Sequence, residues 1–187
     1  MKPGEIVYTG TSKKGNPLVI RSIQKGDENI MADYINSISQ EKTFVRFQGE
    51  TISLNEETKY VEDQLIKLEK NETVQLLVFC HEKLIGVSDL NMGERVEKHV
   101  GIFGISLLRE YRGEGVGKLL MELVIKQAEK HIPYLHIISL SVFSNNLVAT
   151  EMYKNLGFVQ YGSLPKGILH QGKYVDHNHM YKVIRNT

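Results

Sequence analysis

The stretch Ile105–Lys118 reads Ile-Ser-Leu-Leu-Arg-Glu-Tyr-Arg-Gly-Glu-Gly-Val-Gly-Lys. An apolar run leads into it, three glycines follow at the alternate positions 113, 115 and 117, and an amphipathic segment comes next. Strand, glycine-rich turn and helix in this order present free backbone N–H groups and a helix N-terminus to a phosphate. Glycine lets the ligand approach the main chain and adopts the positive φ that such turns require. The stretch therefore predicts a pyrophosphate site, with Arg112 as a cation at the mouth of the turn.

Two common phosphate motifs do not fit this stretch. A Walker loop requires Ser or Thr after its lysine, but Leu119 follows Lys118. A dinucleotide fingerprint requires a third glycine where Lys118 stands. The remaining pattern, Arg-x-x-Gly-x-Gly from Arg112 to Gly117, resembles the pyrophosphate loop of the GNAT family of N-acetyltransferases, which bind acetyl-CoA.

A second stretch, residues 140–158, strengthens this resemblance. It is similar to the strand-then-helix signature of the same family, in which Asn, Ala, Tyr and Gly-Phe recur at the spacing of Asn146, Ala149, Tyr153 and Gly157-Phe158. The chain therefore resembles a GNAT acetyltransferase over roughly residues 18 to 183.

Turn residues, helix caps and apolar periodicity predict the order ββααβββαβαββ, with the first strand optional. Asp27 is expected to cap the first helix, and Ser53 with Glu56 forms a capping box for the second. The last two strands, 158–161 and 174–183, are expected to flank a looser connection over 165–172. Residues 1–17 are interpreted as an N-terminal hairpin or extension, and residues 18–187 as the N-acetyltransferase domain.

The predicted fold class is α/β (α+β), with one mixed sheet between helices. The resemblance implies a mostly antiparallel central sheet of about six to seven strands, splayed between the strands around 99–108 and 135–144. In this family the pantetheine arm of the co-substrate pairs with main-chain groups at the splay. Here those groups are expected at Leu107 and Leu108.

Length, composition and charge are typical of a single globular domain that does not bind a polyanion. A length of 187 residues with 41% hydrophobic content suits a single globular core, and a net charge of +1 offers no electrostatic case for nucleic acid or an anionic membrane. The lone Cys80 excludes an internal disulfide. We find neither a signal peptide nor an apolar run of membrane-spanning length, so we expect a cytoplasmic protein.

The resemblance implies specific roles for the two motifs. The pyrophosphate is expected on the glycine loop, which comprises Arg112, Gly113, Gly115, Val116, Gly117 and Lys118. Asn146 is expected to bind the pantetheine or the main chain at the splay, and it can also cap the helix that follows it. We expect no metal, because His177 and His179 alternate on one strand face without an evident third ligand.

The implied reaction is direct attack of a primary amine on acetyl-CoA within a ternary complex. Tyr153 stands where the family often places the acid for the departing thiolate. The base is left open, since no carboxylate occurs in residues 100–104. The alternatives are a water relay without a dedicated base and one of four substitute residues, Glu50, Asp89, Glu97 and His99.

The acceptor is also left open between a small molecule and a protein or peptide N-terminus. The segments expected to line its site, 40–52 and 164–174, carry mixed charge, which disfavours a polyamine. The closing motif Gly172–Asp176 resembles the subgroup of ribosomal-protein and small-molecule N-acetyltransferases, and homodimers are common in the family. The alternative function is a non-catalytic acetyl-CoA sensor or regulatory module.

Overall fold

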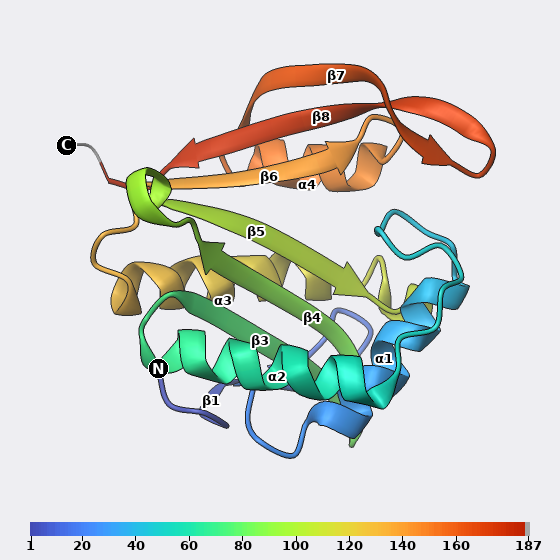
Figure 1. Ribbon diagram of the computed structural model, residues 1–187. Helices are drawn as coiled ribbons and strands as arrows, with labels where there is room; N and C mark the ends of the chain where they lie inside the picture. The colour runs from blue at the N-terminus through green and yellow to red at the C-terminus, as the bar shows by residue number, and fades with distance from the viewer. Residues whose placement is uncertain (186–187) are drawn as a thin grey trace. The chain divides into compact units, whose positions relative to one another are not determined.

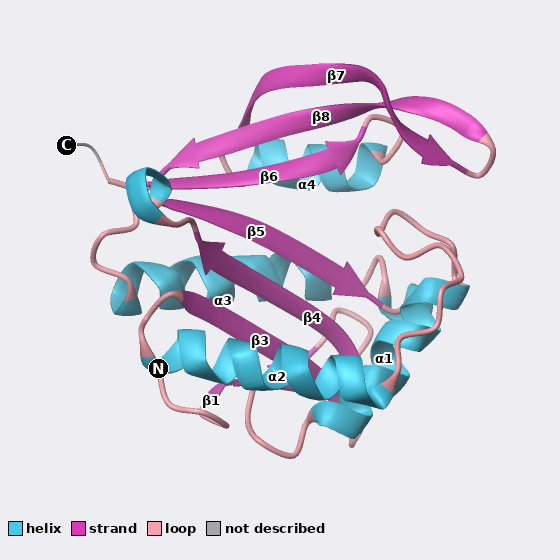
Figure 2. Ribbon diagram, in the orientation of Figure 1, coloured by secondary structure: helices cyan, strands magenta, loops and turns pink. Residues whose placement is uncertain are grey.

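The structure is a computed structural model that describes residues 1–185 and contains the predicted order of helices and strands. The first half of the chain forms β1 (Ile6–Thr11), β2 (Pro17–Ser22), α1 (Glu28–Gln40), α2 (Leu54–Glu69), β3 (Thr73–Cys80) and β4 (Lys83–Met92). The second half forms β5 (Val100–Leu107), α3 (Val116–His131), β6 (Ile137–Phe143), α4 (Leu147–Asn155), β7 (Val159–His170) and β8 (Lys173–Val183). Two short 3-10 turns, η1 (Arg95–Glu97) and η2 (Arg109–Tyr111), flank β5. Figure 2 shows this mixture of helices and strands, and the described residues contain eight strands instead of the expected six to seven.

The described chain divides into two compact units, and each is described by itself. The first unit contains residues 1–91 and 104–133, and the second contains residues 92–103 and 134–185 of the described chain. Strand β5 contributes residues to both units, because the boundary falls between residues 103 and 104. The expected extension, residues 1–17, lies in the first unit with β1 paired along β2, and its assignment as a separate region stays a prediction.

In the first unit, β1, β2, β3 and β4 pair antiparallel in chain order. The end of β5 lies beside β4, where the Leu108 N–H donates to Ile85 O at 2.9 Å and Ser88 Oγ donates to Gly104 O at 2.9 Å. Every residue of β3 is buried, because α2 lies in front of this strand and α3 behind it (Figure 1). A strand covered on both faces reads as a nearly continuous apolar run, and that is how β3 appears in the sequence.

The two predicted helix starts have different outcomes. The capping box before α2 is confirmed, since the Ser53 side chain accepts from the Glu56 N–H and the Glu56 carboxylate accepts from the Ser53 N–H. Asp27 occupies the cap position of α1, but its side chain makes no capping hydrogen bond, so that prediction was wrong. Its carboxylate instead accepts two hydrogen bonds from the Arg21 guanidinium, at 2.6 and 2.8 Å. A charge-assisted bidentate pair outcompetes a single neutral N–H donor.

The second unit contains the order β5-β6-β8-β7. Residues 100–102 of β5 pair in parallel with residues 137–139 of β6, whereas β6 with β8 and β8 with β7 are antiparallel. The four following residues of β5, 104–107, belong to the first unit, so the splay between β5 and β6 stays a prediction.

The predicted loose connection over 165–172 was wrong. Strand β7 continues to His170, and the turn to β8 consists of Gln171 and Gly172, both with positive φ as in a tight hairpin turn. The misleading signal was Pro165, which breaks most strand patterns. The structure accommodates it at an irregularity, where the pairing register with β8 shifts between Leu164 and Ile168.

No helix within residues 1–185 is long and apolar enough to cross a membrane.

Candidate functional site

The glycine loop follows η2 and ends at the start of α3. Gly113 and Gly115 have φ of 77° and 83°, values that favour glycine, and Gly115 is the N-cap residue of the helix. The Leu119 N–H donates to Gly115 O at 3.1 Å. The N–H groups of residues 116–118 precede it in the first turn, where an α-helix has no carbonyl to accept them. The loop therefore fits a pyrophosphate, which accepts such N–H groups and is favoured by the helix dipole.

Arg112 is held by the protein on three sides. Its Nη2 lies 2.5 Å from Glu41 Oε2, its Nε donates to Leu107 O at 2.8 Å, and its Nη1 donates to Thr43 Oγ1 at 3.3 Å. The charge of Arg112 is thus balanced by a carboxylate from the end of α1. Arg112 braces the entrance to the glycine loop against the segment that follows α1.

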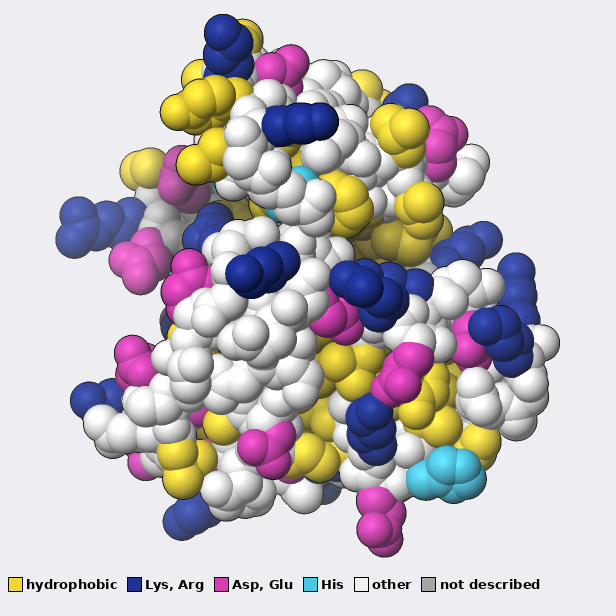
Figure 3. Space-filling model, turned by 90° about the vertical axis from the view of Figure 1, so that its right-hand side faces the viewer, with side chains coloured by type: hydrophobic (Ala, Val, Ile, Leu, Met, Phe, Trp, Pro, Cys, Tyr) yellow, Lys and Arg dark blue, Asp and Glu magenta, His cyan; other side chains and the backbone are white. Residues whose placement is uncertain are grey.

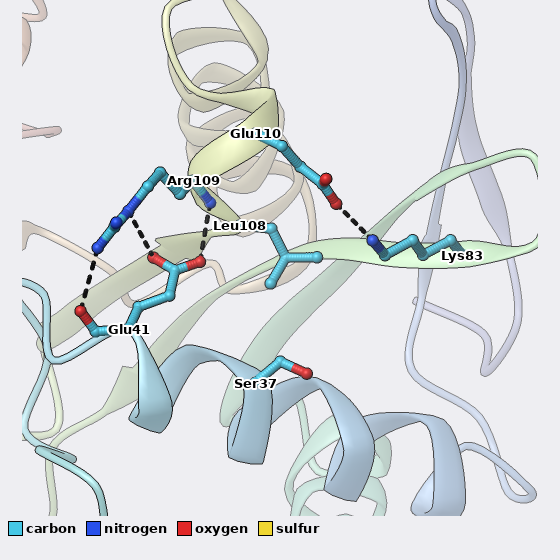
Figure 4. A pocket seen from close by; sticks show the side chains of 6 residues that line it. All are labelled: Ser37, Glu41, Lys83, Leu108, Arg109 and Glu110. Carbon is cyan, nitrogen blue, oxygen red and sulfur yellow. Dashed lines mark hydrogen bonds and ion pairs between the residues drawn. The ribbon is translucent and has the colours of Figure 1, made fainter.

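A shallow surface cavity of about 430 Å³ lies beside this brace (Figure 4). Its lining comes from α1, β4, η2 and the cap residues of α1 and η2, and comprises Ser37, Glu41, Lys83, Leu108, Arg109 and Glu110. The Glu41 carboxylate also accepts the Arg109 N–H at 2.9 Å, and Lys83 pairs with Glu110. Figure 4 shows that these two pairs contact η2 from opposite sides. The residues that line the cavity therefore help to fix the position of η2, which leads into the glycine loop.

The main chain before the loop is partly engaged. The Leu108 N–H donates to Ile85 O, and Leu108 O accepts the Tyr111 N–H at 3.0 Å. Leu107 O accepts from the Arg112 side chain. The Leu108 N–H is thus occupied, whereas the carbonyl oxygens of Leu107 and Leu108 each keep a second lone pair for a ligand.

One of the four base candidates, Asp89, has a distinct environment. It lies on β4 opposite Gln75 of β3, and its carboxylate accepts a hydrogen bond from Asn91 Nδ2. A Cβ at position 104 would lie 2.9 Å from Asp89 Oδ1, so Gly104 of β5 leaves the room that this carboxylate occupies. Burial raises the pKa of Asp89 to about 6, and the hydrogen bond from Asn91 only partly opposes this shift. Such a carboxylate changes protonation near the pH at which a general base works.

Three polar side chains accompany Asp89: Gln75 on β3, Asn91 on β4 and Tyr60 on α2. We call Tyr60, Gln75, Asp89 and Asn91 the Asp89 cluster. Gln75 Nε2 donates to the Tyr60 hydroxyl at 2.8 Å. Gln75 Oε1 is buried and has no hydrogen-bond partner within the part of the chain that the structure describes. An unpaired buried acceptor is costly, and it offers a ready partner for an N–H donor of a ligand.

The other three base candidates lack this desolvation. Glu97 lies in η1 and His99 just after it, and both are exposed. Glu50 is exposed as well, and the N–H groups of Glu50 and Gln48 lower the pKa of its carboxyl. Among the three carboxylates, Asp89 is the one whose surroundings favour proton exchange near neutral pH.

The two predicted residues of the second unit lie at opposite ends of α4. Asn146 is the N-cap, and its side chain accepts the Ala149 N–H at 3.3 Å, which confirms the capping role. Tyr153 is buried against the Phe158 ring, with centroids 6.1 Å apart, and burial raises its pKa to about 12. Tyr153 is therefore a protonated hydrogen-bond donor throughout the neutral pH range.

The histidine pair on β8 has close rings. The centroids of His177 and His179 lie 4.7 Å apart. Within residues 1–185, no group of three or more His, Cys, Asp or Glu side chains is placed to hold a metal ion.

Two residues near the glycine loop had no signal in the sequence. The side chain of Glu114, between the two positive-φ glycines, is buried under the β1–β2 turn, and that of Lys13 lies next to Gly115. Nothing in the spacing connects residues about 100 positions apart, so only the folded chain reveals these contacts.

Charges on the molecular surface are mixed. On the face shown in Figure 3, Lys and Arg side chains are interspersed with Asp and Glu. This pattern agrees with the net charge of +1.

Comparisons with known proteins agree on one family. Residues 35–158 match the model of the family described as "Acetyltransferase (GNAT) family". The SPbeta prophage-derived uncharacterized N-acetyltransferase YokL of Bacillus subtilis (strain 168) is 26% identical over 162 residues, which cover 87% of each chain. The L-amino acid N-acetyltransferase AaaT of Escherichia coli (strain K12) is 30% identical over 112 residues, covering 59% of this chain and 68% of that protein. A crystal structure of an acetyltransferase of the GNAT family from Streptococcus pneumoniae superposes with a TM-score of 0.82 and 26% identity, covering 90% of this chain and 99% of that one.

Proposed function

Because the chain belongs to the GNAT family of acetyltransferases and is an acetyl-CoA-dependent N-acetyltransferase, we propose that its acceptor is a small-molecule primary amine and that Asp89 accepts the amine proton. The observation that carries this proposal is the desolvated Asp89 carboxylate beside Gly104. The relative AaaT, named as an L-amino acid N-acetyltransferase, supports a small acceptor.

The Asp89 cluster suits an ammonium group. A carboxylate with little solvent around it attracts a cation strongly, and the open acceptor Gln75 Oε1 supplies a second hydrogen bond. The ammonium first loses one proton to solvent water, and the neutral amine nitrogen then forms a bond to the thioester carbonyl carbon and becomes much more acidic. A carboxylate with a pKa of about 6 then takes its proton, while the C–S bond breaks and the thiolate departs.

Acetyl-CoA is proposed to bind along the glycine loop. The N–H groups of Val116, Gly117 and Lys118 donate to the pyrophosphate oxygens, and Gly113 and Gly115 keep the approach clear. Pairing of the pantetheine arm is proposed for Leu107 and Leu108, whose carbonyl oxygens each keep a second lone pair beside the Arg112 and Tyr111 donors. Asn146 is proposed to contact the arm through its amide N–H₂, which its capping bond leaves available.

Tyr153 is proposed to donate a hydrogen bond to the departing thiolate. With its pKa at about 12, full proton transfer to a thiolate, whose conjugate thiol has a pKa of about 8.5, is unfavourable. Its role is therefore stabilisation of the developing charge by a donor that stays protonated.

We expect Tyr153→Phe to lower kcat by about 10- to 100-fold with little change in the KM for acetyl-CoA, because one transition-state hydrogen bond is lost. Steady-state kinetics at saturating acceptor measure this effect. Tyr161→Phe is the matched control, since Tyr161 is 61% exposed on β7, and its kcat should stay within about twofold of the wild type. Equal kcat in the Tyr153→Phe variant and the wild type would reject the donor role.

We also propose that the protein works in the cytoplasm on a freely diffusing acceptor and not on nucleic acid or at a membrane. The near-neutral net charge supports this proposal, because binding to a polyanion requires an excess of basic side chains.

The proposal is tested by measuring release of free CoA from acetyl-CoA with a panel of amines. The panel contains amino acids, polyamines, aminoglycosides and short peptides with varied N-termini. Turnover with amino acids or another small amine supports the proposal. Turnover restricted to peptides would overturn the acceptor class, and binding of acetyl-CoA without turnover on any member would favour a larger protein acceptor.

A further inference from the structure

The turn between β1 and β2 is fastened to the glycine loop through Glu114. Glu114 Oε2 accepts from Ser12 Oγ at 2.7 Å and from Asn16 Nδ2 at 2.8 Å, and Oε1 lies 3.4 Å from Lys14 Nζ. The Lys13 N–H donates to Glu114 O at 3.0 Å, and only 3% of the Glu114 side chain is exposed. The hydrogen bond from Ser12 lowers the pKa of the Glu114 carboxyl, so this group remains charged at neutral pH.

This arrangement requires an explanation, because a carboxylate within a phosphate-binding loop repels the ligand. Three donors from the β1–β2 turn, on Ser12, Lys14 and Asn16, contact the Glu114 carboxylate and compensate its negative charge. The consequence is that the turn, which is about 100 positions earlier in the chain, has a fixed place beside the loop.

The fixed turn places Lys13 at the N-terminus of α3. A Cβ on Gly115 would lie 3.1 Å from Lys13 Cε and 3.3 Å from its Cδ and Cγ, so the Lys13 side chain runs across this glycine. Ion pairs to the Lys13 ammonium do not occur among residues 1–185. Arg112, by contrast, has its charge balanced by Glu41.

We propose that Lys13 is a ligand of the CoA pyrophosphate, carried to the glycine loop by the β1–β2 turn and held there through Glu114. The inference rests on the proposed binding of acetyl-CoA at this loop. The ammonium supplies the mobile positive charge that the braced Arg112 does not. Its aliphatic stem crosses Gly115, the N-cap residue of α3, where backbone N–H groups already favour an anion.

The test is the affinity for CoA and for 3′-dephospho-CoA, measured by isothermal titration calorimetry. Lys13→Met keeps an unbranched apolar stem but removes the ammonium and its charge. We expect it to weaken binding of both ligands by about tenfold, the effect of one charge-assisted hydrogen bond. Lys25→Met, which removes an exposed lysine from another turn of the same unit, is the matched control and should change either affinity by less than about twofold.

The outcomes separate this inference from the proposed function. If wild-type protein does not bind CoA, the acetyl-CoA site itself is wrong. If wild-type protein binds CoA and Lys13→Met binds it equally well, Lys13 is rejected as a pyrophosphate ligand, while the acetyl-CoA site is retained. If the loss in Lys13→Met disappears with 3′-dephospho-CoA, Lys13 contacts the 3′-phosphate and the pyrophosphate assignment is overturned. An equal loss of affinity in Lys25→Met would show that the effect comes from the lower net charge of the protein, and it would also overturn the assignment.

Discussion

Gly115→Asp is expected to abolish acetyl-CoA binding, with the affinity at least about 100-fold lower than that of the wild type. Three effects add. Gly115 has φ of 83°, which a side chain adopts only at a cost, and a Cβ there would press on the Lys13 side chain. The new carboxylate would also stand at the helix N-terminus, where the pyrophosphate is proposed to bind, and would repel it. Calorimetric titration with acetyl-CoA measures the change.

The matched control for this variant is Gly172→Asp. Gly172 also has positive φ, 74°, and a Cβ there would meet no atom within 4 Å, so the two variants share the backbone cost without sharing the loop. Gly172→Asp should bind acetyl-CoA like the wild type. Wild-type affinity in Gly115→Asp would show that the pyrophosphate does not bind at this loop.

Asp89→Asn is expected to lower kcat/KM by about 100- to 10,000-fold, the usual contribution of a general base. In the wild type, the rate should rise with pH around 6 as the Asp89 carboxyl loses its proton, because burial raises its pKa to about this value. An amide does not titrate, so this limb of the pH–rate profile should be absent from the variant. The measurement is kcat/KM between pH 5 and 9 with the acceptor identified by the amine panel.

The same variant should be more stable than the wild type above pH 6. The folded protein binds the Asp89 proton more tightly than the unfolded chain does, since the pKa rises from 3.8 to about 6. The wild type is therefore most stable with respect to this group below pH 4 and loses stability as the pH rises through 6. Asp89→Asn avoids this loss, and its thermal unfolding at pH 8 should show a gain of about 1–3 kcal/mol that shrinks toward pH 4.

Lower activity together with higher stability distinguishes loss of the base from misfolding. Glu97→Gln makes the same chemical change at the exposed position in η1 and should leave both the rate and the stability unchanged. A wild-type pH–rate profile in Asp89→Asn would reject Asp89 as the base and favour a water relay.

The sequence by itself determined the family and the order of the elements. Positive φ at Gly113 and Gly115, the capping box at Ser53 and the β3 pattern depend on residues within a few positions of one another. Such local constraints are readable from spacing and side-chain chemistry. Pro165 shows the limit of this reading, because whether a proline ends a strand depends on the pairing partner, here β8.

Only the tertiary structure distinguishes the surroundings of the charged groups. Asp89, Glu50, Glu97 and His99 were equal candidates in the sequence, and burial beside β3 and Gly104 separates Asp89 from the rest. Lys13 acquires its place through contacts that join the β1–β2 turn to Glu114, about 100 positions away. The physical reason is the same in both cases: desolvation and charge pairing depend on neighbours in space, and a single sequence does not specify those neighbours.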